Sequence, residues 1–252
     1  MPAPRLPERL KRLPVAHRAL HDGTAACPEN SMAAIRAAMA AGYAVELDLQ
    51  ISADNEVFVF HDEDLSRLTG TSGRVDETPA GRLSTLPLLG GAEHPPPLSD
   101  VLDLVAGSVP LLLEFKPQRD GGDRLAAAAA PLLRSYRGAL AVMSFDPALV
   151  ASLADHLPDV ARGLTTMTWR GKDAEGLSPA TRARLNAIAD YETTGASFIS
   201  HHHRDLGSAA VTRLRGLGAD VLCWTIRSAA EEAKARQIAC NVTFEGYRAA
   251  LP

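Results

Sequence analysis

The sequence has little cysteine: Cys27, Cys223 and Cys240 are the three among 252 residues. They are odd in number and widely spaced, so neither a disulfide framework nor a zinc-binding spacing can be recognised. This pattern favours a reducing compartment. Cys223 and Cys240 lie in apolar, strand-like runs, and we expect both to be small buried residues.

Long hydrophobic segments are missing too. The first 18 residues carry charge but no apolar stretch long enough for a signal peptide. The alanine-rich run at 125–130 is followed by Pro131, and no segment approaches the ~20 residues of a transmembrane helix. We therefore expect no transmembrane segment and predict a cytoplasmic protein.

There is no excess of positive charge, since 26 Lys and Arg oppose 30 Asp and Glu and the formal net charge is -4. Nucleic-acid backbones need clustered cations, so nucleic acid is not an expected partner. One small phosphorylated ligand remains compatible with this balance. The hydrophobic content of 46% is that of an ordinary globular protein. The oligomeric state is left open.

Apolar, β-rich runs alternate with helical patterns along the chain. We predict strands at 14–17, 44–49, 57–61, 111–116, 140–144, 162–165, 196–200, 221–226 and 241–244. We predict helices at 30–41, 98–106, 123–135, 147–155, 178–190, 207–216 and 228–236. Several helices have a residue suited to cap their first turn, namely Asn30, Ser99, Asp146, Ser178 and Ser228.

Alternating strands and helices indicate parallel strands joined by right-handed crossovers. A closed barrel and an open doubly wound sheet both satisfy this pattern. No glycine-rich phosphate fingerprint follows the first strand, which weakens the nucleotide-binding form of the open sheet. We therefore predict an α/β fold, a (β/α)8 TIM barrel in a single domain over 1–252. The extra strand at 57–61 and a small insertion at about 62–97 follow its second strand.

Polar side chains stand where the predicted barrel strands end, which is where such barrels carry their active residues. Side chains two apart on a strand share a face, so Glu46 pairs with Asp48 and Glu114 with Lys116. The full set is His17, Arg18, Glu46, Asp48, His61, Glu114, Lys116 and Trp224.

Each of these residues also has an ordinary structural interpretation. A histidine on an apolar strand is more often a satisfied core residue than a catalyst, and Glu114 with Lys116 could form a structural ion pair. Taken together these interpretations fail, because three carboxylates converging inside a barrel repel one another by several kcal/mol unless a cation lies among them. Carboxylate oxygens favour Mg²⁺ or Ca²⁺ over zinc.

A charge count indicates the ligand. Three carboxylates, one divalent cation and the two cations Arg18 and Lys116 leave a net charge of +1, which one phosphodiester anion would balance. Without the metal the same groups would carry -1 and repel that anion. His17 and His61 titrate near neutrality and suit a general base and a general acid.

At this point the sequence resembles a known family. The segment "AHRA…CPENSMAAIRAAMAAGYAVELDLQISADNEVFVFHDEDLSRLTG" is similar to the N-terminal signature of glycerophosphodiester phosphodiesterases, and "LLLEFK" at 111–116 to their third-strand motif. The resemblance continues more thinly through "SFD" at 144–146 and "CWTI" at 223–226. It implies a (β/α)8 barrel and a divalent cation. It also implies hydrolysis of glycerophosphodiesters to glycerol 3-phosphate and an alcohol.

Carried over by position, the resemblance assigns a role to seven residues. His17 and His61 match the acid–base histidines. The metal ligands correspond to Glu46, Asp48 and Glu114, and the phosphate-facing cations to Arg18 and Lys116. It favours the neighbouring glycerol hydroxyl as the nucleophile, which would form a cyclic phosphate intermediate. Water is the alternative nucleophile. Which of the two histidines is the base stays open.

Three positions depart from the family pattern. Ala19 replaces the usual glycine after His-Arg, so that turn is expected to avoid positive φ or to differ in its loop. Asn55 replaces a glycine before the extra strand, a mild change because asparagine tolerates left-handed geometry. The ending "VTFEGYRAALP" at 242–252 replaces a threonine-aspartate-proline motif and alters the substrate end of the pocket.

Several residues have two interpretations of similar weight. Glu29 and Asn30 precede a helix, so capping explains them as well as catalysis does. His201, His202 and His203 either line the mouth or lie in a solvated loop. Trp224 either forms a wall of the glycerol or alcohol pocket or is a core residue.

Two other functions compete with the diesterase. A phospholipase D-like activity on lysophospholipids would need an apolar surface near the mouth, for which Leu86, Leu88 and Leu89 are the candidates. A catalytically silent barrel could bind a phosphorylated metabolite, but binding alone does not need two proton carriers.

Overall fold

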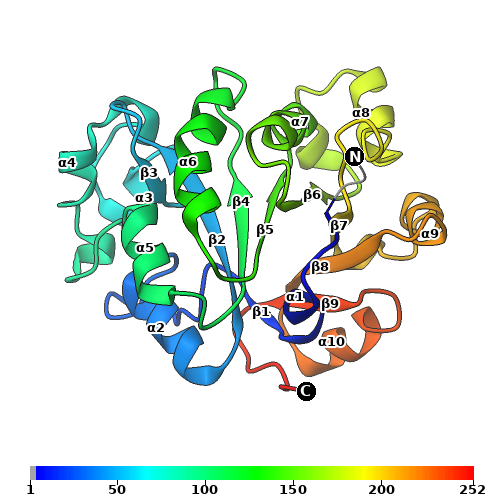
Figure 1. Cartoon of the computed structure of the whole chain (residues 1–252), viewed down its shortest axis with the longest axis horizontal. Coiled ribbons are helices and arrows are strands. Elements are labelled where there is room, and N and C mark those ends of the chain that lie inside the picture. Colours follow the sequence, from blue (N-terminus) through cyan, green and yellow to red (C-terminus); the bar gives the residue numbers. More distant parts are fainter. Residues whose placement is uncertain (1–3) are drawn as a thin grey trace.

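The computed structural model describes residues 4–252. Eight parallel strands follow one another around a barrel, which the pairing of β1 with both β2 and β9 closes (Figure 1). They are β1 (Val15–Ala16), β2 (Ala44–Ile51), β4 (Leu111–Phe115), β5 (Leu140–Ser144), β6 (Ala161–Thr166), β7 (Phe198–His202), β8 (Asp220–Ile226) and β9 (Asn241–Phe244). The predicted TIM barrel is therefore confirmed.

Strand β3 (Val57–Val59) is the extra strand, and it pairs antiparallel with β2 outside the barrel. Helices cover the outer surface of the barrel (Figure 1). The longer ones are α2 (Met32–Ala41), α5 (Leu98–Val105), α6 (Asp123–Ser135), α7 (Pro147–His156), α8 (Pro179–Asn186), α9 (Ala209–Gly216) and α10 (Ala229–Ala235). All seven lie within or within one residue of the predicted helical ranges.

Two apolar layers follow from the alternation of side chains along the strands. The outward-facing residues pack with the helices in one large cluster that includes Val45, Leu47 and Leu113. The inward-facing residues form a smaller cluster that includes Leu112 and Phe198. The barrel interior is therefore a packed core below the polar residues.

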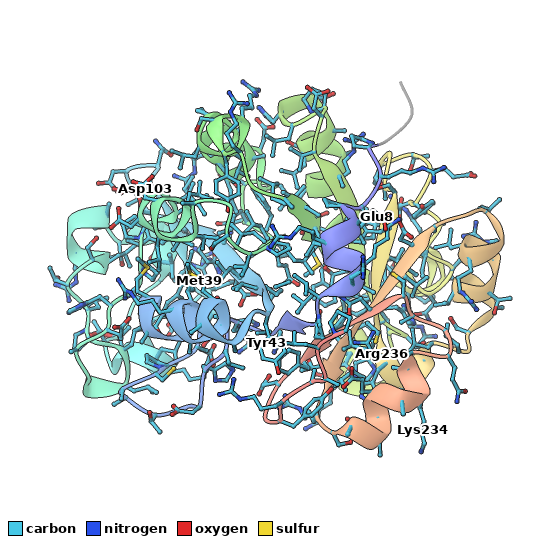
Figure 2. All side chains as sticks on the ribbon, turned by 60° about the horizontal axis from the view of Figure 1, so that its bottom comes forward. Glu8, Met39, Tyr43, Asp103, Lys234 and Arg236 are labelled. Carbon is cyan, nitrogen blue, oxygen red and sulfur yellow. The ribbon has the colours of Figure 1, made fainter. Side chains whose placement is uncertain are left out.

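A short helix at the N-terminus, α1 (Glu8–Arg12), belongs to this inner layer and was not predicted. Its Leu10 is fully buried against the inward-facing residues of the strands. Asn241 at the start of β9 donates hydrogen bonds to the carbonyl oxygens of Leu10 (2.7 Å) and Leu13 (2.6 Å). Figure 2 shows α1, with Glu8, lying across this end of the barrel. Helix α1 thus covers the N-terminal face of the barrel.

The segment at 62–97 leaves the barrel after β3 and lies at the left of Figure 1. It contains α3 (Ser66–Thr69), η1 (Val75–Glu77), α4 (Ala80–Leu83) and η2 (Leu88–Gly90). Phe58 and Phe60 pack with its apolar side chains in a separate cluster. Leu86 and Leu88 are buried in that cluster, so neither supplies the apolar surface that a lysophospholipid would need, whereas the third candidate, Leu89, is 39% exposed.

The caps were only partly predicted. Asp146, Ser178 and Ser228 accept hydrogen bonds from the first-turn amides of α7, α8 and α10. The prediction that Asn30 caps α2 was wrong, because the neighbouring Ser31 caps this helix and Asn30 is at a left-handed φ of 58°. The prediction that Ser99 caps α5 was also wrong, since α5 begins directly after Pro97.

The turn after β1 is left-handed although it lacks glycine. Arg18 and Ala19 have φ of 51° and 64°, so the expectation that Ala19 avoids positive φ was wrong. The Arg18 amide reaches a Glu46 carboxylate oxygen (2.8 Å), and the Ala19 amide reaches the Glu46 carbonyl (3.0 Å). These two hydrogen bonds hold the strained turn. Asn55 is left-handed as expected, at φ 67°.

Two expectations from composition meet different outcomes. No helix within residues 4–252 combines the length and apolar character that a membrane crossing requires. Cys223 is buried, but Cys240 is exposed at the end of the α10 loop, so its predicted burial was wrong.

Candidate active site

The open end of the barrel holds a cavity of ≈ 230 Å³. All eight residues that the sequence singles out line this cavity, although they come from β2, β4, β8 and the segments that follow β1, β3 and β4. Met143, Phe145, Ser200, Thr225, Arg227 and Thr243 complete its lining.

Three buried carboxylates form the centre of the site. Glu46 and Asp48 share the inner face of β2, and Glu114 lies opposite Asp48 in the β2–β4 ladder. One oxygen from each lies within 4.8 Å of the others. Burial, together with the charges of Asp48 and Glu114, raises the pKa of Glu46 well above its ordinary value. Burial and the two neighbouring carboxylates therefore hold back ionisation of Glu46.

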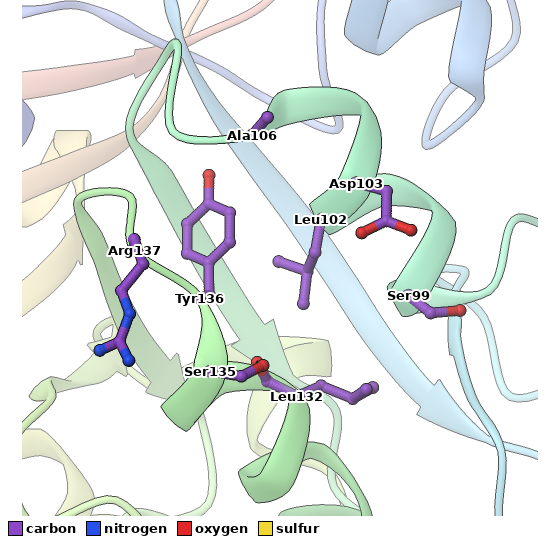
Figure 3. Close-up of a pocket in the computed structure, with 8 residues that line it drawn as sticks. All are labelled: Ser99, Leu102, Asp103, Ala106, Leu132, Ser135, Tyr136 and Arg137. Atoms are coloured by element: carbon purple, nitrogen blue, oxygen red, sulfur yellow. The ribbon is translucent and has the colours of Figure 1, made fainter.

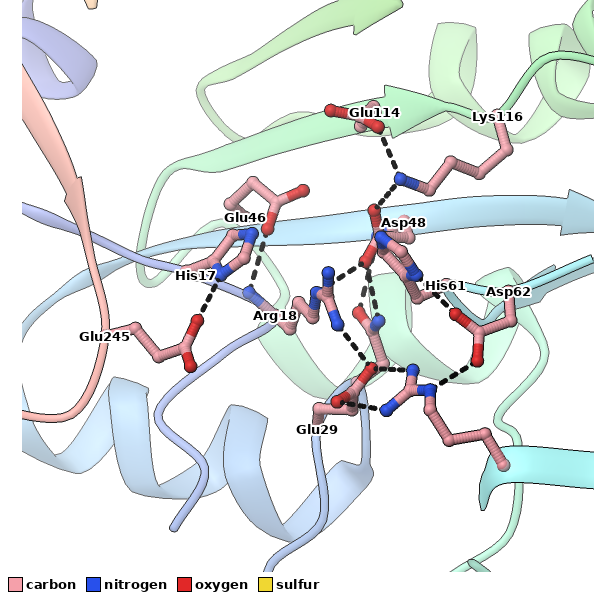
Figure 4. Close-up of polar contacts among 12 residues, drawn as sticks. His17, Arg18, Glu29, Glu46, Asp48, His61, Asp62, Glu114, Lys116 and Glu245 are labelled. Carbon is pink, nitrogen blue, oxygen red and sulfur yellow. Dashed lines mark hydrogen bonds and ion pairs between the residues drawn. The ribbon is translucent and has the colours of Figure 1, made fainter. Parts of the chain in front are cut away.

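Two cations only partly offset this repulsion. The Lys116 ammonium lies 2.8 Å from an Asp48 oxygen and 2.5 Å from a Glu114 oxygen (Figure 4). The Arg18 Nε lies 3.7 Å from the other Asp48 oxygen. Although burial opposes ionisation of Asp48, the charges of Lys116, His61 and Arg18 together outweigh it, and the pKa of Asp48 is lowered. Burial lowers the pKa of Lys116 in turn, but Asp48 and Glu114 raise it by more.

His17 is held by a carboxylate from the far end of the chain. Its Nδ1 lies 2.6 Å from Glu245 Oε2. Arg227 donates to both oxygens of the same carboxylate, at 2.7 and 3.3 Å. The hydrogen bond with His17 and the contact with Arg227 lower the pKa of Glu245 to about 2, so this carboxylate is ionised at neutral pH.

His61 has a matching arrangement on the other side of the carboxylates (Figure 4). Its Nδ1 lies 2.6 Å from Asp62 Oδ1, and Arg67 donates to the second Asp62 oxygen at 2.5 Å. Burial lowers the pKa of His61, and the charges of Lys116 and Arg18 act in the same direction against that of Asp48. Each histidine is thus one member of a His–carboxylate–Arg chain.

Glu29 and Asn30 are part of this polar network rather than caps. Asn30 donates to Asp48 Oδ2 at 2.8 Å and accepts from the Asp48 amide at 3.3 Å. Glu29 accepts from Arg18 (2.8 Å) and binds Arg67 through both oxygens (2.7 and 3.0 Å). Glu29 thereby links the cation beside Asp48 to the chain that holds His61.

Aromatic side chains form the outer part of the cavity. Trp224 is half-buried, and its indole nitrogen donates to the Ser200 carbonyl at 3.0 Å. Phe145 packs edge-to-face against it, with ring centroids 5.4 Å apart. His202 also packs edge-to-face against Trp224, with ring centroids 5.1 Å apart. Trp224 therefore lines the cavity, and its alternative interpretation as an ordinary core residue is wrong.

The three consecutive histidines diverge. His201 is buried on the outer face of β7, where its Nδ1 lies 2.8 Å from the Thr166 hydroxyl. His202 lies beside Trp224, and the ring of His203 lies tilted against that of His202, with centroids 5.1 Å apart. Only His202 thus approaches the cavity wall.

A second hollow, of ≈ 340 Å³, lies between α5 and α6 on the outside of the barrel (Figure 3). Its lining, all within the described part of the chain, offers Asp103 and Arg137 but no histidine. Both side chains are exposed, and the Tyr136 hydroxyl is occupied by the Gly107 amide at 3.0 Å. This groove lacks the converging buried groups of the barrel cavity.

The residues that sequence reasoning missed are the partners of the histidines. Glu245 lies 228 positions from His17, and only the altered C-terminal ending pointed to that region. Asp62 directly follows His61, so its position next to the histidine could have identified it as a partner. Ser200 and Thr243 carry no motif, and only the closed barrel brings their hydroxyl groups into the cavity.

The donor set fits a divalent metal ion. Three carboxylates offer the oxygen ligands that Mg²⁺ and Ca²⁺ prefer, and burial together with the charges of Asp48 and Glu114 raises the pKa of Glu46, so a cation beside it would favour its ionised form. Glu46 accepts a hydrogen bond from the neutral backbone amide of Arg18 at 2.8 Å.

The chain matches the model of the "Glycerophosphoryl diester phosphodiesterase family" over residues 17–243. The match covers most of the chain, from the first histidine of the cavity to the last strand. No curated protein sequence matches it.

Solved structures of similar fold include a phosphodiesterase of Oleispira antarctica in complex with the product sn-glycerol-3-phosphate. It has a TM-score of 0.76 and 23% identity, covering 96% of this chain and 92% of that one. A glycerophosphodiester phosphodiesterase of Parabacteroides distasonis has a TM-score of 0.71 and 20% identity, with coverage of 93% and 92%. One from Thermotoga maritima has a TM-score of 0.69 and 21% identity, with coverage of 92% and 94%. At these identities the similarity establishes the fold.

Proposed function

Because the chain belongs to the glycerophosphoryl diester phosphodiesterase family and is therefore a phosphoric diester hydrolase, we propose that it cleaves glycerophosphodiesters to glycerol 3-phosphate and an alcohol. The reaction uses one divalent cation, Mg²⁺ or Ca²⁺, and the pair His17 and His61. The whole chain, 1–252, acts as one catalytic domain.

The observation that carries the proposal is the convergence of two histidines on three buried carboxylates in one cavity. Glu46, Asp48 and Glu114 are the metal ligands. When bound, the cation supplies Lewis-acid stabilisation of the negative charge that builds on the phosphate oxygens.

The phosphate binds between the cations of the site. Arg18 and Lys116 line the cavity and are both held at carboxylates. Because Asp48 and Glu29 outweigh the effect of burial, the pKa of Arg18 is raised and its charge is permanent. The two cations orient the diester and stabilise the charge on its oxygens in the transition state.

Proton transfer falls to the Nε2 atoms of the histidines. The Nδ1 atoms face Glu245 and Asp62 at 2.6 Å, so a proton held there leaves Nε2 as the reacting atom. One histidine removes a proton from the nucleophile, which is the adjacent glycerol hydroxyl or a water molecule, and the other protonates the leaving alcohol. Trp224 provides a wall against which the substrate packs.

The test is hydrolysis of a panel of glycerophosphodiesters by the purified protein, before and after treatment with a chelator. We expect release of glycerol 3-phosphate that the chelator abolishes and that added Mg²⁺ or Ca²⁺ restores. Lysophospholipids in the same panel test the phospholipase D-like alternative. Full activity in the chelator would contradict the metal assignment, and no release from any diester would contradict the function.

A further inference from the structure

Arg162 is a buried cation whose charge lacks a close partner within residues 4–252. It lies on β6 with 7% of its surface exposed. Its Nε donates to the Thr194 carbonyl at 3.3 Å, but its Nη1 is buried and has no hydrogen-bond partner in this part of the chain. Burial lowers the pKa of Arg162, and the carboxylate that acts in the opposite direction, Asp155, is exposed. A buried arginine is rarely found without a paired anion.

Ser197 places a second unpartnered donor beside Arg162. Its amide donates to the Arg162 carbonyl at 2.9 Å, which sets the two residues side by side where the β6–β7 ladder begins. Ala161 and Phe198, the next residues along, belong to the cluster that fills the barrel. Because side chains alternate along a strand, Arg162 and Ser197 both face outward. The Ser197 hydroxyl oxygen is also buried without a partner among the described residues.

These two groups require an acceptor that carries negative charge. A guanidinium group only donates hydrogen bonds, and a hydroxyl group can turn its proton toward any acceptor. A water molecule would satisfy the hydrogen bonds but would leave the buried charge uncompensated, and a buried charge costs far more than an unpaired polar group. An anion satisfies both requirements.

The surrounding chain favours a small anion. Gly195 packs so closely on the guanidinium group that a Cβ atom there would lie 2.9 Å from Nη2 and 3.4 Å from Nε. Thr194, whose carbonyl oxygen holds Nε, is 4% exposed. The segment that leads into β7 thus lies directly against the guanidinium group. Such close packing suits a monatomic ion better than a phosphate.

We propose that Arg162 and Ser197 bind a chloride ion on the outer face of the barrel, beside the segment that enters β7. The ion neutralises the guanidinium group and joins the beginnings of two neighbouring strands. Neither residue lines the barrel cavity, which lies at the other end of these strands. The inference is therefore independent of the proposed function.

Thermal unfolding in sodium chloride and in sodium gluconate, at equal ionic strength and with a chelator present, tests the site. Arg162→Met keeps an aliphatic side chain but removes the charge. At ten times its Kd, chloride should raise Tm over gluconate by roughly 3–6 °C more in the parent than in this variant. The comparison cancels the general effect of each salt, which acts on both proteins. Ser197→Ala should need about fivefold more chloride for the same shift.

Arg134→Met is the matched control. Arg134 also donates to a backbone carbonyl, that of His156, but its side chain is exposed, so this variant should respond to chloride as the parent does. Crystals of the parent grown in bromide provide a measurement that needs no variant, because the anomalous signal of bromide should lie beside Arg162. A water molecule alone at that position, or an equal chloride response in the parent and Arg162→Met, would overturn the inference.

Discussion

At the scale of single residues, the two histidines differ from the other histidines of the chain in facing the carboxylate centre. We expect His17→Ala and His61→Ala each to lower turnover by at least ~10²-fold, because each removes one proton-transfer group. Both side chains are partly exposed, at 16% and 29%, so thermal unfolding should change little. Initial rates at saturating metal measure the effect.

His156→Ala is the control for this pair. His156 binds Asp123 at 3.0 Å on the outer surface, and its variant should keep the turnover of the parent. Near-normal turnover of either cavity variant would mean that its histidine carries no proton in the reaction.

The carboxylate that holds His17 gives a second prediction. Glu245→Gln keeps the shape of the side chain but removes the charge that faces Nδ1. Because an ionised partner fixes the ring orientation and stabilises the imidazolium, turnover should fall at least ~10-fold. Metal affinity should be unchanged, since Glu245 lies outside the carboxylate cluster. Rates and a calorimetric metal titration on the same protein separate the two quantities.

Glu231→Gln is its matched control. Glu231 also contacts Arg227, through the backbone amide at 2.8 Å, but not His17. If the two variants lose turnover equally, the effect comes from Arg227 and not from the orientation of His17.

The residues that were predictable are those whose spacing along a strand carries the information. Glu46 with Asp48, and Glu114 with Lys116, share a face because of the two-residue period of a strand. Glu245 could not be assigned a partner, since its contact with His17 depends on β9 closing the barrel against β1. Asn30 was misjudged because a residue before a helix has two available roles, and the Ser31 hydroxyl takes the cap.

At the scale of elements, Glu114 on β4, the proposed metal ligand, and the cation Lys116 directly after β4 lie two positions apart, and their substitutions should have opposite effects. Glu114→Gln removes a charge and a good ligand, so metal affinity should fall, while excess Mg²⁺ or Ca²⁺ restores part of the activity through Glu46 and Asp48. Lys116→Met removes the ammonium that contacts Asp48 and Glu114. Metal binding should hold or tighten while phosphate binding weakens.

Calorimetric titration of metal into Glu114→Gln and into Lys116→Met, with activity measured at rising metal concentration, distinguishes the two results. Parent-like metal affinity in Glu114→Gln would exclude Glu114 as a ligand. Weaker metal binding in Lys116→Met would show that the lysine organises the carboxylates rather than competing with the ion.

The elements themselves were largely predictable, because strand and helix periods persist in apolar segments. Strand β7 is shifted most from its predicted bounds, since it spans 198–202 instead of 196–200. Helix α8 ends at Asn186 instead of the predicted 190. The end of α8 has a physical cause, since Ile188 is left-handed at φ 48°. Helix α1 was missed because its five residues are too few to show a helical pattern. Its position depends on contact with the inner apolar layer of the barrel.

The β6–β7 pair supplies a prediction about pH. Burial lowers the pKa of His201 to about 4, below its ordinary value of ~6.5. Between these values the unfolded chain binds a proton that the folded chain does not, so stability is lost as pH falls from about 6.5 to about 4. His201→Gln removes this term, and its free energy of unfolding should fall less than that of the parent over that window.

Urea unfolding of both proteins at pH 7.5, 5.5 and 4.5 measures the difference. The carboxylates and the other histidines titrate in both proteins, so their contributions cancel. Parallel pH dependence of the two curves would mean that His201 is protonated as easily in the folded chain as in the unfolded one.

For the whole molecule, the barrel forms a site from strands that are far apart in sequence while packing an apolar core below it. The polar groups are thereby gathered at one end of the barrel, above the apolar core. Ionised Glu46 lowers the stability of the metal-free protein, since burial and the charges of Asp48 and Glu114 raise its pKa. A cation that binds the folded chain and not the unfolded one offsets this cost.

Metal addition should therefore stabilise the entire fold, independently of catalysis. At a free metal concentration of 100 times Kd the gain is about 2.7 kcal/mol, which for a chain of this size raises Tm by roughly 2–4 °C per kcal/mol. Asp48→Asn should lose most of the increase, because it removes a charge from the centre of the cluster. Glu192→Gln, at an exposed position, should keep it. Thermal unfolding at stepped Mg²⁺ and Ca²⁺ concentrations measures the shift, and an equal rise in both variants would place the stabilising ion outside the barrel cavity.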